Sequence, residues 1–272
     1  MGTMPVRLAV AMASVTLCLI AAGCGSPGTQ RPVTGAAPAS SGSAPASTAS
    51  PASPHPSGAA TSSPSASEHP APSSAPPASP GPVFQASTSA LTEAMRTRMT
   101  GVSWHSGCPV SLGQLRLLRL SYWGFDHAVH QGERIVNASA AASLTQAFRQ
   151  LFAARFPIRQ MRVVDDFGGD DERSMLADNT SAFNCRQVPG TSVWAQHAYG
   201  LAVDINPFEN PEIRDGKADP PAAAAWADRS RSSPAMIRHG DAVWLAFDSI
   251  GWTWGGDWSS LKDYQHFSAN GL

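Results

Sequence analysis

The sequence has no cluster of Lys and Arg, and charged residues make up only 14% of its 272 positions. Its formal net charge is −1 with histidine counted as neutral. Proteins that bind nucleic acid usually carry a basic patch that contacts the phosphates. We therefore expect no nucleic-acid partner.

The N-terminal apolar segment, residues 8–22, is too short to cross a bilayer comfortably, since a spanning helix needs about 20 apolar residues. It follows Arg7 and ends in small residues before Cys24, a pattern typical of export. Residues 1–23 resemble a bacterial lipoprotein signal peptide, which would leave Cys24 as a lipidated first residue. An ordinary secretory signal is the alternative. We expect a protein anchored to the outer face of the cytoplasmic membrane, or a secreted one.

The segment after Cys24 lacks aromatic residues and has only two charged ones, Arg31 and Glu68. Nearly all its other residues are Pro, Ser, Ala, Gly or Thr. Such a composition cannot bury enough apolar surface to offset the entropy of ordering. We predict that residues 24–82 form a disordered linker that holds a domain away from the membrane. A segment without function would have the same composition. His55 and His69 lie here and are not expected to bind metal.

Residues 83–272 are long enough for one domain with a substantial core. Helices and strands do not alternate strictly along this part, which predicts an α+β domain with a small, mostly antiparallel sheet and flanking helices. The predicted helices cover residues 88–99, 241–250 and a segment from a cap at 137 or 139 to 156. The predicted strands cover residues 115–122, 134–137, 161–165, 201–206, 252–254 and 265–267.

Cysteine is scarce, with four residues in the whole chain. Cys18 would leave with the signal peptide and Cys24 would carry lipid. Cys108 and Cys185 then remain as a pair in an oxidising compartment, where disulfides form and persist. We predict a disulfide between them.

Two histidines and an aspartate form the candidate metal site. His197 and Asp204 would lie on opposite faces of one straight strand, so they can converge only if the chain turns near Gly200. Together with His266 they would supply three zinc ligands and leave a position for water. The spacing of His197 and Asp204 alone favours an ordinary surface histidine, because it recurs by chance in many chains.

A catalytic zinc also needs a nearby carboxylate that carries a proton. Asp263 precedes His266 by three residues and is the first candidate. Asp257, in the turn that follows Gly255, is the rival. Either residue could instead be a solvated loop carboxylate.

Two motifs carry a family resemblance: His197-x-x-Gly200-x-Ala202-x-Asp204 and Asp263-x-x-His266. They resemble the VanY-like D-alanyl-D-alanine carboxypeptidase family of zinc metallopeptidases. Residues 179–186, 197–207 and 252–258 are similar to segments of its extracytoplasmic members. The resemblance implies a hedgehog/DD-peptidase-like zinc peptidase domain.

The resemblance also implies the roles of five residues. Zn²⁺ would be held by His197, Asp204 and His266. Asp263 would act as general base and acid, although many members have Glu there. Arg186 would steady the carbonyl oxygen or a substrate carboxylate, unless its place beside Cys185 makes it structural.

One departure from the family pattern concerns the residue two positions before the first histidine. The family usually has Ser there, and this chain has Ala195. Loss of a hydroxyl that orients a ligand or the substrate can lower affinity or activity by roughly 10–100-fold. Gln196 is a candidate for the same contact. Because the three ligands and Asp263 are present, we still expect activity.

These features predict a monomeric, zinc-dependent peptidase that acts on peptidoglycan stem peptides and reaches the membrane through Cys24. D-alanyl-D-alanine carboxypeptidase activity is the first hypothesis. An L-alanyl-D-glutamate endopeptidase of the same family is the second. A zinc-containing cell-wall-binding module without catalysis is the third, and the intact Asp263 argues against it.

Overall fold

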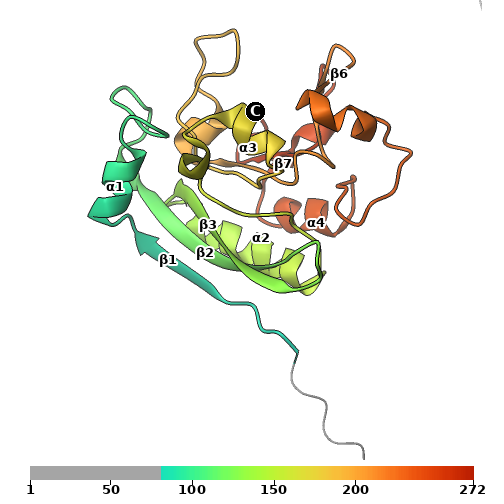
Figure 1. The fold of residues 1–272 in the computed structure, drawn as a ribbon, viewed down its shortest axis with the longest axis horizontal. Coiled ribbons are helices and arrows are strands. Elements are labelled where there is room, and N and C mark those ends of the chain that lie inside the picture. The colour runs from blue at the N-terminus through green and yellow to red at the C-terminus, as the bar shows by residue number, and fades with distance from the viewer. Residues whose placement is uncertain (1–80) are drawn as a thin grey trace, which may run out of the picture. The chain divides into compact units, whose positions relative to one another are not determined.

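A computed structural model describes residues 81–272 (Figure 1). The expected signal peptide, Cys24 and nearly all of the expected linker lie outside the described residues. In the part that is described, no helix combines the length and the apolar character needed to cross a membrane. The α-helices are α1 (Glu93–Met99), α2 (Ala141–Ala153), α3 (Asp171–Leu176) and α4 (Ala242–Asp248).

The strands form three small antiparallel sheets, so the domain is α+β as predicted. The first sheet has the order β1-β2-β3, with β1 (Ala86–Ala90), β2 (Leu115–Trp123) and β3 (Val129–Asn137). The second has the order β4-β9-β7, with β4 (Ala202–Asp204), β9 (His266–Ser268) and β7 (Thr253–Trp254). The third has the order β6-β5-β8, with β6 (Lys217–Asp219), β5 (Glu212–Arg214) and β8 (Lys262–Asp263).

Strand β2 is buried on both faces and separates two apolar clusters. Leu118 and Leu120 belong to the larger cluster, which includes the inner face of α2. Leu115 and Leu117 point the other way and pack in the smaller cluster with Met99 of α1. Because successive side chains of a strand point to opposite faces, this one strand contributes to both apolar clusters.

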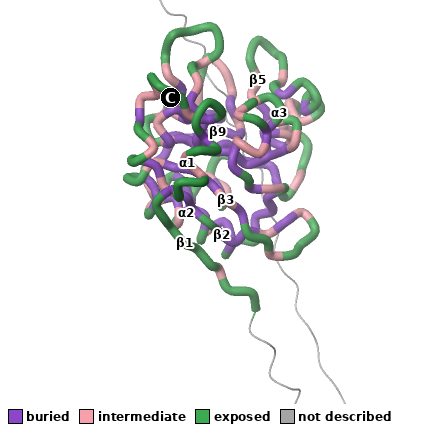
Figure 2. The backbone as a smooth tube through the Cα atoms, turned by 60° about the vertical axis from the view of Figure 1, so that its left-hand side comes forward, coloured by how far each residue is buried: buried purple, intermediate pink, exposed green. Residues whose placement is uncertain are grey.

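Helix α2 covers the first sheet and connects it to the rest of the domain (Figure 1). Its buried stripe includes Leu144, Phe148 and Leu151, which are three or four residues apart and so share one face. The Phe148 ring meets Phe247 of α4 edge to face, with centroids 6.1 Å apart. Phe247 in turn stacks on Phe267 of β9 at 4.1 Å. The aromatic contacts therefore reach β9, the strand that carries His266. Figure 2 shows that the buried parts of the backbone lie together in the middle of the domain.

Two of the predicted elements were wrong. Residues 88–99 are not one helix, because Ala86–Ala90 pairs with β2 and α1 begins only after Thr92, whose Oγ1 accepts from the Met95 amide at 3.2 Å. Residues 161–165 do not form a strand, and Val164–Phe167 is a 3-10 helix. The Arg162 amide donates to the Asn179 side chain at 2.9 Å, so a side chain takes the place of a neighbouring strand.

Several boundaries also moved. The strand expected at 134–137 is the longer β3, and the strand expected at 201–206 is the three-residue β4. Helix α2 begins at Ala141 without a side-chain cap and ends before Phe156. The Gly255–Asp257 turn is a short 3-10 helix. The helix expected at 241–250 is α4, which Asp241 caps by accepting from the Val243 and Trp244 amides.

A disulfide joins Cys108 to Cys185 across 77 residues of sequence, with the two Cα atoms 5.9 Å apart. Cys185 is buried in the smaller cluster, and its amide donates to the Ser103 carbonyl at 2.9 Å. The bond therefore ties the segment around Cys108 to the chain that leads into the candidate site.

We predict that the Cys108→Ala/Cys185→Ala variant unfolds with a free energy lower by roughly 2–5 kcal/mol, because the cross-link restricts the unfolded chain. Urea unfolding followed by tryptophan fluorescence measures the difference. Wild-type protein unfolded in excess reductant is the matched control and should lose a similar amount. An unchanged midpoint in both would contradict the prediction.

Candidate metal centre and active site

The structure brings His197, Asp204 and His266 together; we call these three residues the candidate metal centre. His197 lies in the 3-10 helix Gln196–Tyr199, and Asp204 and His266 are direct partners in the β4–β9 pairing. One ligand atom from each lies within 4.8 Å of the others, and the three residues are 3%, 5% and 6% exposed. Gly200, with φ +67°, makes the turn that lets His197 and Asp204 converge.

Hydrogen bonds fix which nitrogen of each imidazole faces the centre. His197 Nδ1 bonds the Ala182 carbonyl at 2.5 Å, and His266 Nε2 bonds the Leu272 carbonyl at 3.1 Å. Each of these nitrogens must donate, because a carbonyl only accepts. His197 Nε2 and His266 Nδ1 are then the nitrogens that would face a metal ion; they lie 3.3 Å from each other and 3.1 and 3.0 Å from the Asp204 carboxylate oxygens. This donor set, two imidazole nitrogens and a carboxylate oxygen, fits zinc.

Asp204 and His197 shift each other's pKa values so that both charged forms are favoured. Burial alone would raise the pKa of Asp204, but His197 and His266, through their charge and hydrogen bonds, hold it well below its usual range. Burial would lower the pKa of His197, and the Asp204 carboxylate outweighs this effect and raises it. Asp204 is therefore ionised and available as a ligand.

Residues 180–182, here called the bracing segment, hold the candidate metal centre in place through hydrogen bonds. Ser181 and Asp204 exchange both backbone hydrogen bonds, at 3.0 and 3.1 Å. Ala182 accepts from His197, and Thr180 Oγ1 accepts from the Asn206 amide at 3.2 Å. One extended stretch thus orients two of the three candidate ligands.

Arg134 of β3 is fully buried behind this segment. Its Nη1 donates to the Ser181 carbonyl at 2.8 Å, and its guanidinium lies 4.4 Å from the centre of the Phe148 ring. Desolvation lowers its pKa to about 9, and the negative charge of Asp204 opposes this change. A buried cation therefore offsets part of the buried negative charge at the centre.

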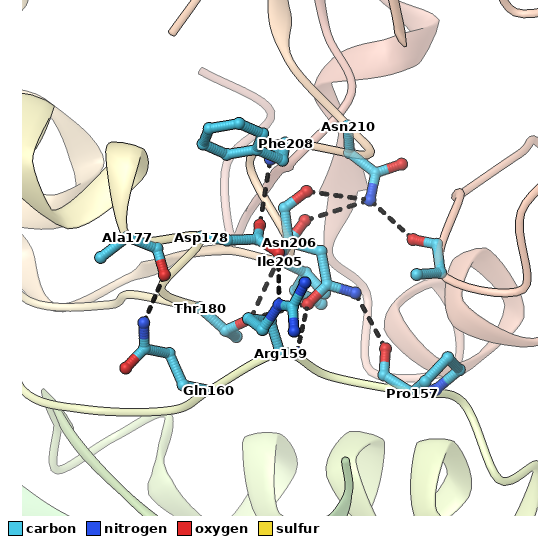
Figure 3. Close-up of polar contacts among 11 residues, drawn as sticks. Pro157, Arg159, Gln160, Ala177, Asp178, Thr180, Ile205, Asn206, Phe208 and Asn210 are labelled. Carbon is cyan, nitrogen blue, oxygen red and sulfur yellow. Dashed lines mark hydrogen bonds and ion pairs between the residues drawn. The ribbon is translucent and has the colours of Figure 1, made fainter. Parts of the chain in front are cut away.

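The turn after Asp204 is held by buried amide side chains (Figure 3). Asn206, with φ 45°, accepts from the Arg159 amide at 3.1 Å and donates to the Pro157 carbonyl at 2.9 Å. Asn210 donates to the carbonyls of Ile205 and Asn206, both at 3.2 Å. These bonds fix the direction in which the chain leaves β4.

Asp263 lies at the end of β8, opposite Glu212 of β5, and lines a cavity of about 800 Å³ that includes the candidate metal centre. It is 9% exposed, and its Oδ1 is buried without a hydrogen-bond partner among the described residues. Burial raises its pKa to about 8. The Asp204 and Glu212 carboxylates add to the rise, while His266 and Arg186 oppose it. This carboxyl group is suited to take up and release a proton.

Asp257, the rival for the same role, is engaged elsewhere. Its carboxylate accepts from Trp244 Nε1 at 3.0 Å and bonds His239 Nδ1 at 2.9 Å. It lines the cavity, but its oxygens connect the 3-10 helix Gly255–Asp257 to α4. The geometry favours Asp263 as the proton carrier.

Arg186 also lines the cavity and forms an ion pair with Asp171 of α3 at 2.7 Å. Its Nε is buried and has no hydrogen-bond partner among the described residues. Asp171 therefore fixes the guanidinium while leaving a donor on it.

Acidic side chains dominate the cavity. Six carboxylates line it, against two arginines, and the second arginine, Arg214, pairs with Glu212 at 2.8 Å. Partial burial raises the pKa of Asp219, and its neighbours Glu212 and Asp171 add to the rise. The six carboxylates belong to Asp171, Asp204, Glu212, Asp219, Asp257 and Asp263.

Ala195 is the N-cap of the 3-10 helix that carries His197, and no side chain caps that helix. The Ala195 amide donates to the Arg186 carbonyl at 3.1 Å, and Ala195 lines the cavity. Gln196 lines the same cavity. The backbone of this turn is thus held without the hydroxyl that the family pattern has.

Comparison with protein families supports the resemblance. Residues 189–269 match the family model described as D-alanyl-D-alanine carboxypeptidase. This part of the chain is similar to that carboxypeptidase family. The matched region contains the whole candidate metal centre and Asp263, whereas Arg186 and the bracing segment precede it. No curated protein and no solved structure matches the chain.

Three supporting residues were not predicted from the sequence. Arg134 directly precedes the apolar residues Ile135 and Val136, and that placement was the one local signal of its burial. Asp171 and Glu212 gave no signal, because acidic residues in short segments are usually solvated. Their partners, Arg186 and Asp263, are respectively 15 and 51 residues away in sequence.

We predict that Gly255→Ala weakens zinc binding about 10-fold or more. A Cβ at Gly255 would lie 2.6 Å from the Asp263 carbonyl oxygen and 3.3 Å from the His266 Cβ, so both residues must move. Competition with a fluorescent chelator measures the affinity.

Gly113→Ala is the matched control, because a Cβ there meets nothing closer than 3.7 Å. It should bind zinc as the wild type does. Equal affinities in all three proteins would show that the position of Gly255 does not constrain the centre.

Proposed function

We propose that the domain is a zinc-dependent peptidase that hydrolyses peptidoglycan stem peptides. The observation that carries the proposal is the convergence of three buried ligand atoms in a cavity that also holds Asp263. The family match supports peptide hydrolysis as the reaction class. Zinc is the ion that this set of nitrogen and oxygen donors fits best.

The first candidate bond is the one between two D-alanines at the end of a stem peptide. The description of the matched family favours it. A carboxypeptidase must accept a free carboxylate, and Arg186 is a cavity-lining cation whose charge opposes the rise in the pKa of Asp263. Its partner-free Nε supplies a donor for that carboxylate or for the carbonyl oxygen of the scissile bond.

The second candidate is cleavage between L-alanine and D-glutamate inside the stem. Its substrate also carries a free carboxylate, on the D-glutamate residue, so the pairing of both lining arginines with carboxylates does not separate the two candidates. Products distinguish the two activities: a carboxypeptidase removes one alanine, and an endopeptidase releases the stem at L-alanine.

The chain's own residues would move the proton during hydrolysis. Bound zinc would polarise the scissile carbonyl and lower the pKa of water at the site. Asp263 would accept a proton from the attacking water and pass it to the leaving amine. Arg186, held by Asp171, would donate to the developing negative charge on the carbonyl oxygen.

The same proposal covers the location of the enzyme. A lipid on Cys24 and a linker to residue 82 would place the domain near the outer face of the cytoplasmic membrane, within reach of the cell wall. Export as a free protein after an ordinary signal peptide is the alternative. Metabolic labelling with an alkyne fatty acid, compared with a Cys24→Ser variant, separates them.

We predict that Asp263→Asn lowers kcat at least about 100-fold while zinc stays bound, because removal of a general base typically costs 10²–10⁴-fold. Muropeptide digestion read by mass spectrometry measures turnover, and metal analysis measures zinc. Asp257→Asn is the control and should retain most activity. A fully active Asp263→Asn enzyme would rule out this role.

We also predict that a chelator stops hydrolysis and lowers the melting temperature, since an ion bound only by the folded state stabilises it. Restoring zinc should recover both. Differential scanning fluorimetry follows stability without any substrate. If the melting temperature and the activity of the zinc-loaded protein do not change on chelation, the domain does not use zinc at this centre.

A further inference from the structure

Gln265 is a buried amide in the wall of the active-site cavity, between Asp263 and His266 in sequence. Only 3% of the residue is exposed, and its Oε1 has no hydrogen-bond partner among the described residues. Its Nε2 lies 3.7 Å from the Met175 sulfur, in the same cavity wall. A thioether accepts but cannot donate, so it faces the nitrogen and leaves the oxygen without a partner.

A buried hydrogen-bond acceptor without a partner destabilises a folded protein, because it has lost its hydrogen bonds to water. The other buried amides nearby avoid this cost. Asn206 and Asn210 each have both their oxygen and their nitrogen bonded within the fold. Gln265 differs from them in lining the cavity, where a bound molecule can supply the missing donor.

We propose that Gln265 is a substrate-binding residue whose Oε1 accepts a hydrogen bond from an N–H group of the bound peptide. This inference rests on the proposed peptidase function and adds a specificity contact to it. Six carboxylates line the same cavity against two arginines, and this excess of negative charge favours a donor that carries positive charge. The N–H group could belong to a side-chain ammonium or to a peptide amide.

The test uses the full chain with Gln265→Met, which keeps the shape of the side chain and removes the acceptor. KM should rise roughly 3–30-fold with kcat changed much less, the pattern expected when one substrate hydrogen bond is lost. The melting temperature should stay level or rise, because an unpartnered acceptor has been removed. Gln265→Asn, which draws the oxygen back by one methylene, should also raise KM.

The matched control is Gln150→Met on α2, whose Nε2 donates to Ser249 Oγ at 3.0 Å away from the cavity. Its KM should equal the wild-type value. If Gln265 only supported the fold, Gln265→Met would lower the melting temperature and leave KM unchanged, and that result would overturn the proposal.

Two substrates separate the possible donors: peptides ending in lysyl-D-alanyl-D-alanine with the ε-amine free or acetylated. If the ammonium is the donor, acetylation raises the wild-type KM and has little effect on Gln265→Met. If a peptide amide is the donor, Gln265→Met weakens both substrates equally.

Failure of the proposed function can be distinguished from failure of this inference. If the wild type hydrolyses neither peptide, calorimetric binding of the free-amine peptide to the zinc-loaded protein still compares wild type with Gln265→Met. Weaker binding to the variant supports the inference. Equal binding, or no binding to either protein, overturns it.

Discussion

The burial of the Asp204 carboxylate is the constraint on which the rest of the site depends. A buried charge is costly unless it is paired and hydrogen-bonded. Here the compensation comes from His197 and His266 in front and from Arg134 behind. Three features hold the Asp204 carboxylate between the two imidazoles. They are the β4–β9 pairing, the turn at Gly200 and the fully buried side chain of Arg134.

The strands that carry the candidate ligands are too short to be rigid on their own. β4 and β9 have three residues each, so few ladder bonds fix their positions. Rigidity comes instead from bonds between distant segments, such as the Ser181 bridge to Asp204 and the stacking of Phe247 on Phe267. The larger core around α2 therefore stabilises the centre through side chains rather than through a continuous sheet.

Local patterns in the sequence were sufficient for features whose causes are local. The strand at 115–122 and the apolar stripe of α2 follow from their periodicity. The three candidate ligands needed the family resemblance as well as their residue types, because the spacing of His197 and Asp204 alone favoured an ordinary surface histidine. Residues 161–165 do not form the expected strand, because the Arg162 amide donates to the side chain of Asn179 and not to the backbone of a neighbouring strand. The ion pair between Arg186 and Asp171 could not be predicted from local patterns either, because the two residues meet only in the folded chain.

The two candidate scissile bonds differ in where the free carboxylate of the substrate lies. A carboxypeptidase substrate brings its terminal carboxylate into a cavity lined by six others, and the L-alanyl-D-glutamate bond brings the free carboxylate of the D-glutamate residue into the same cavity. Arg186 is relevant to both, because its pairing with Asp171 neutralises its charge yet leaves the Nε–H as a donor. The scissile carbonyl needs the donor alone, while a free carboxylate also needs net positive charge. Both arginines among the described residues of the cavity wall are paired with carboxylates, so a metal ion held by the candidate metal centre would supply that charge for either substrate.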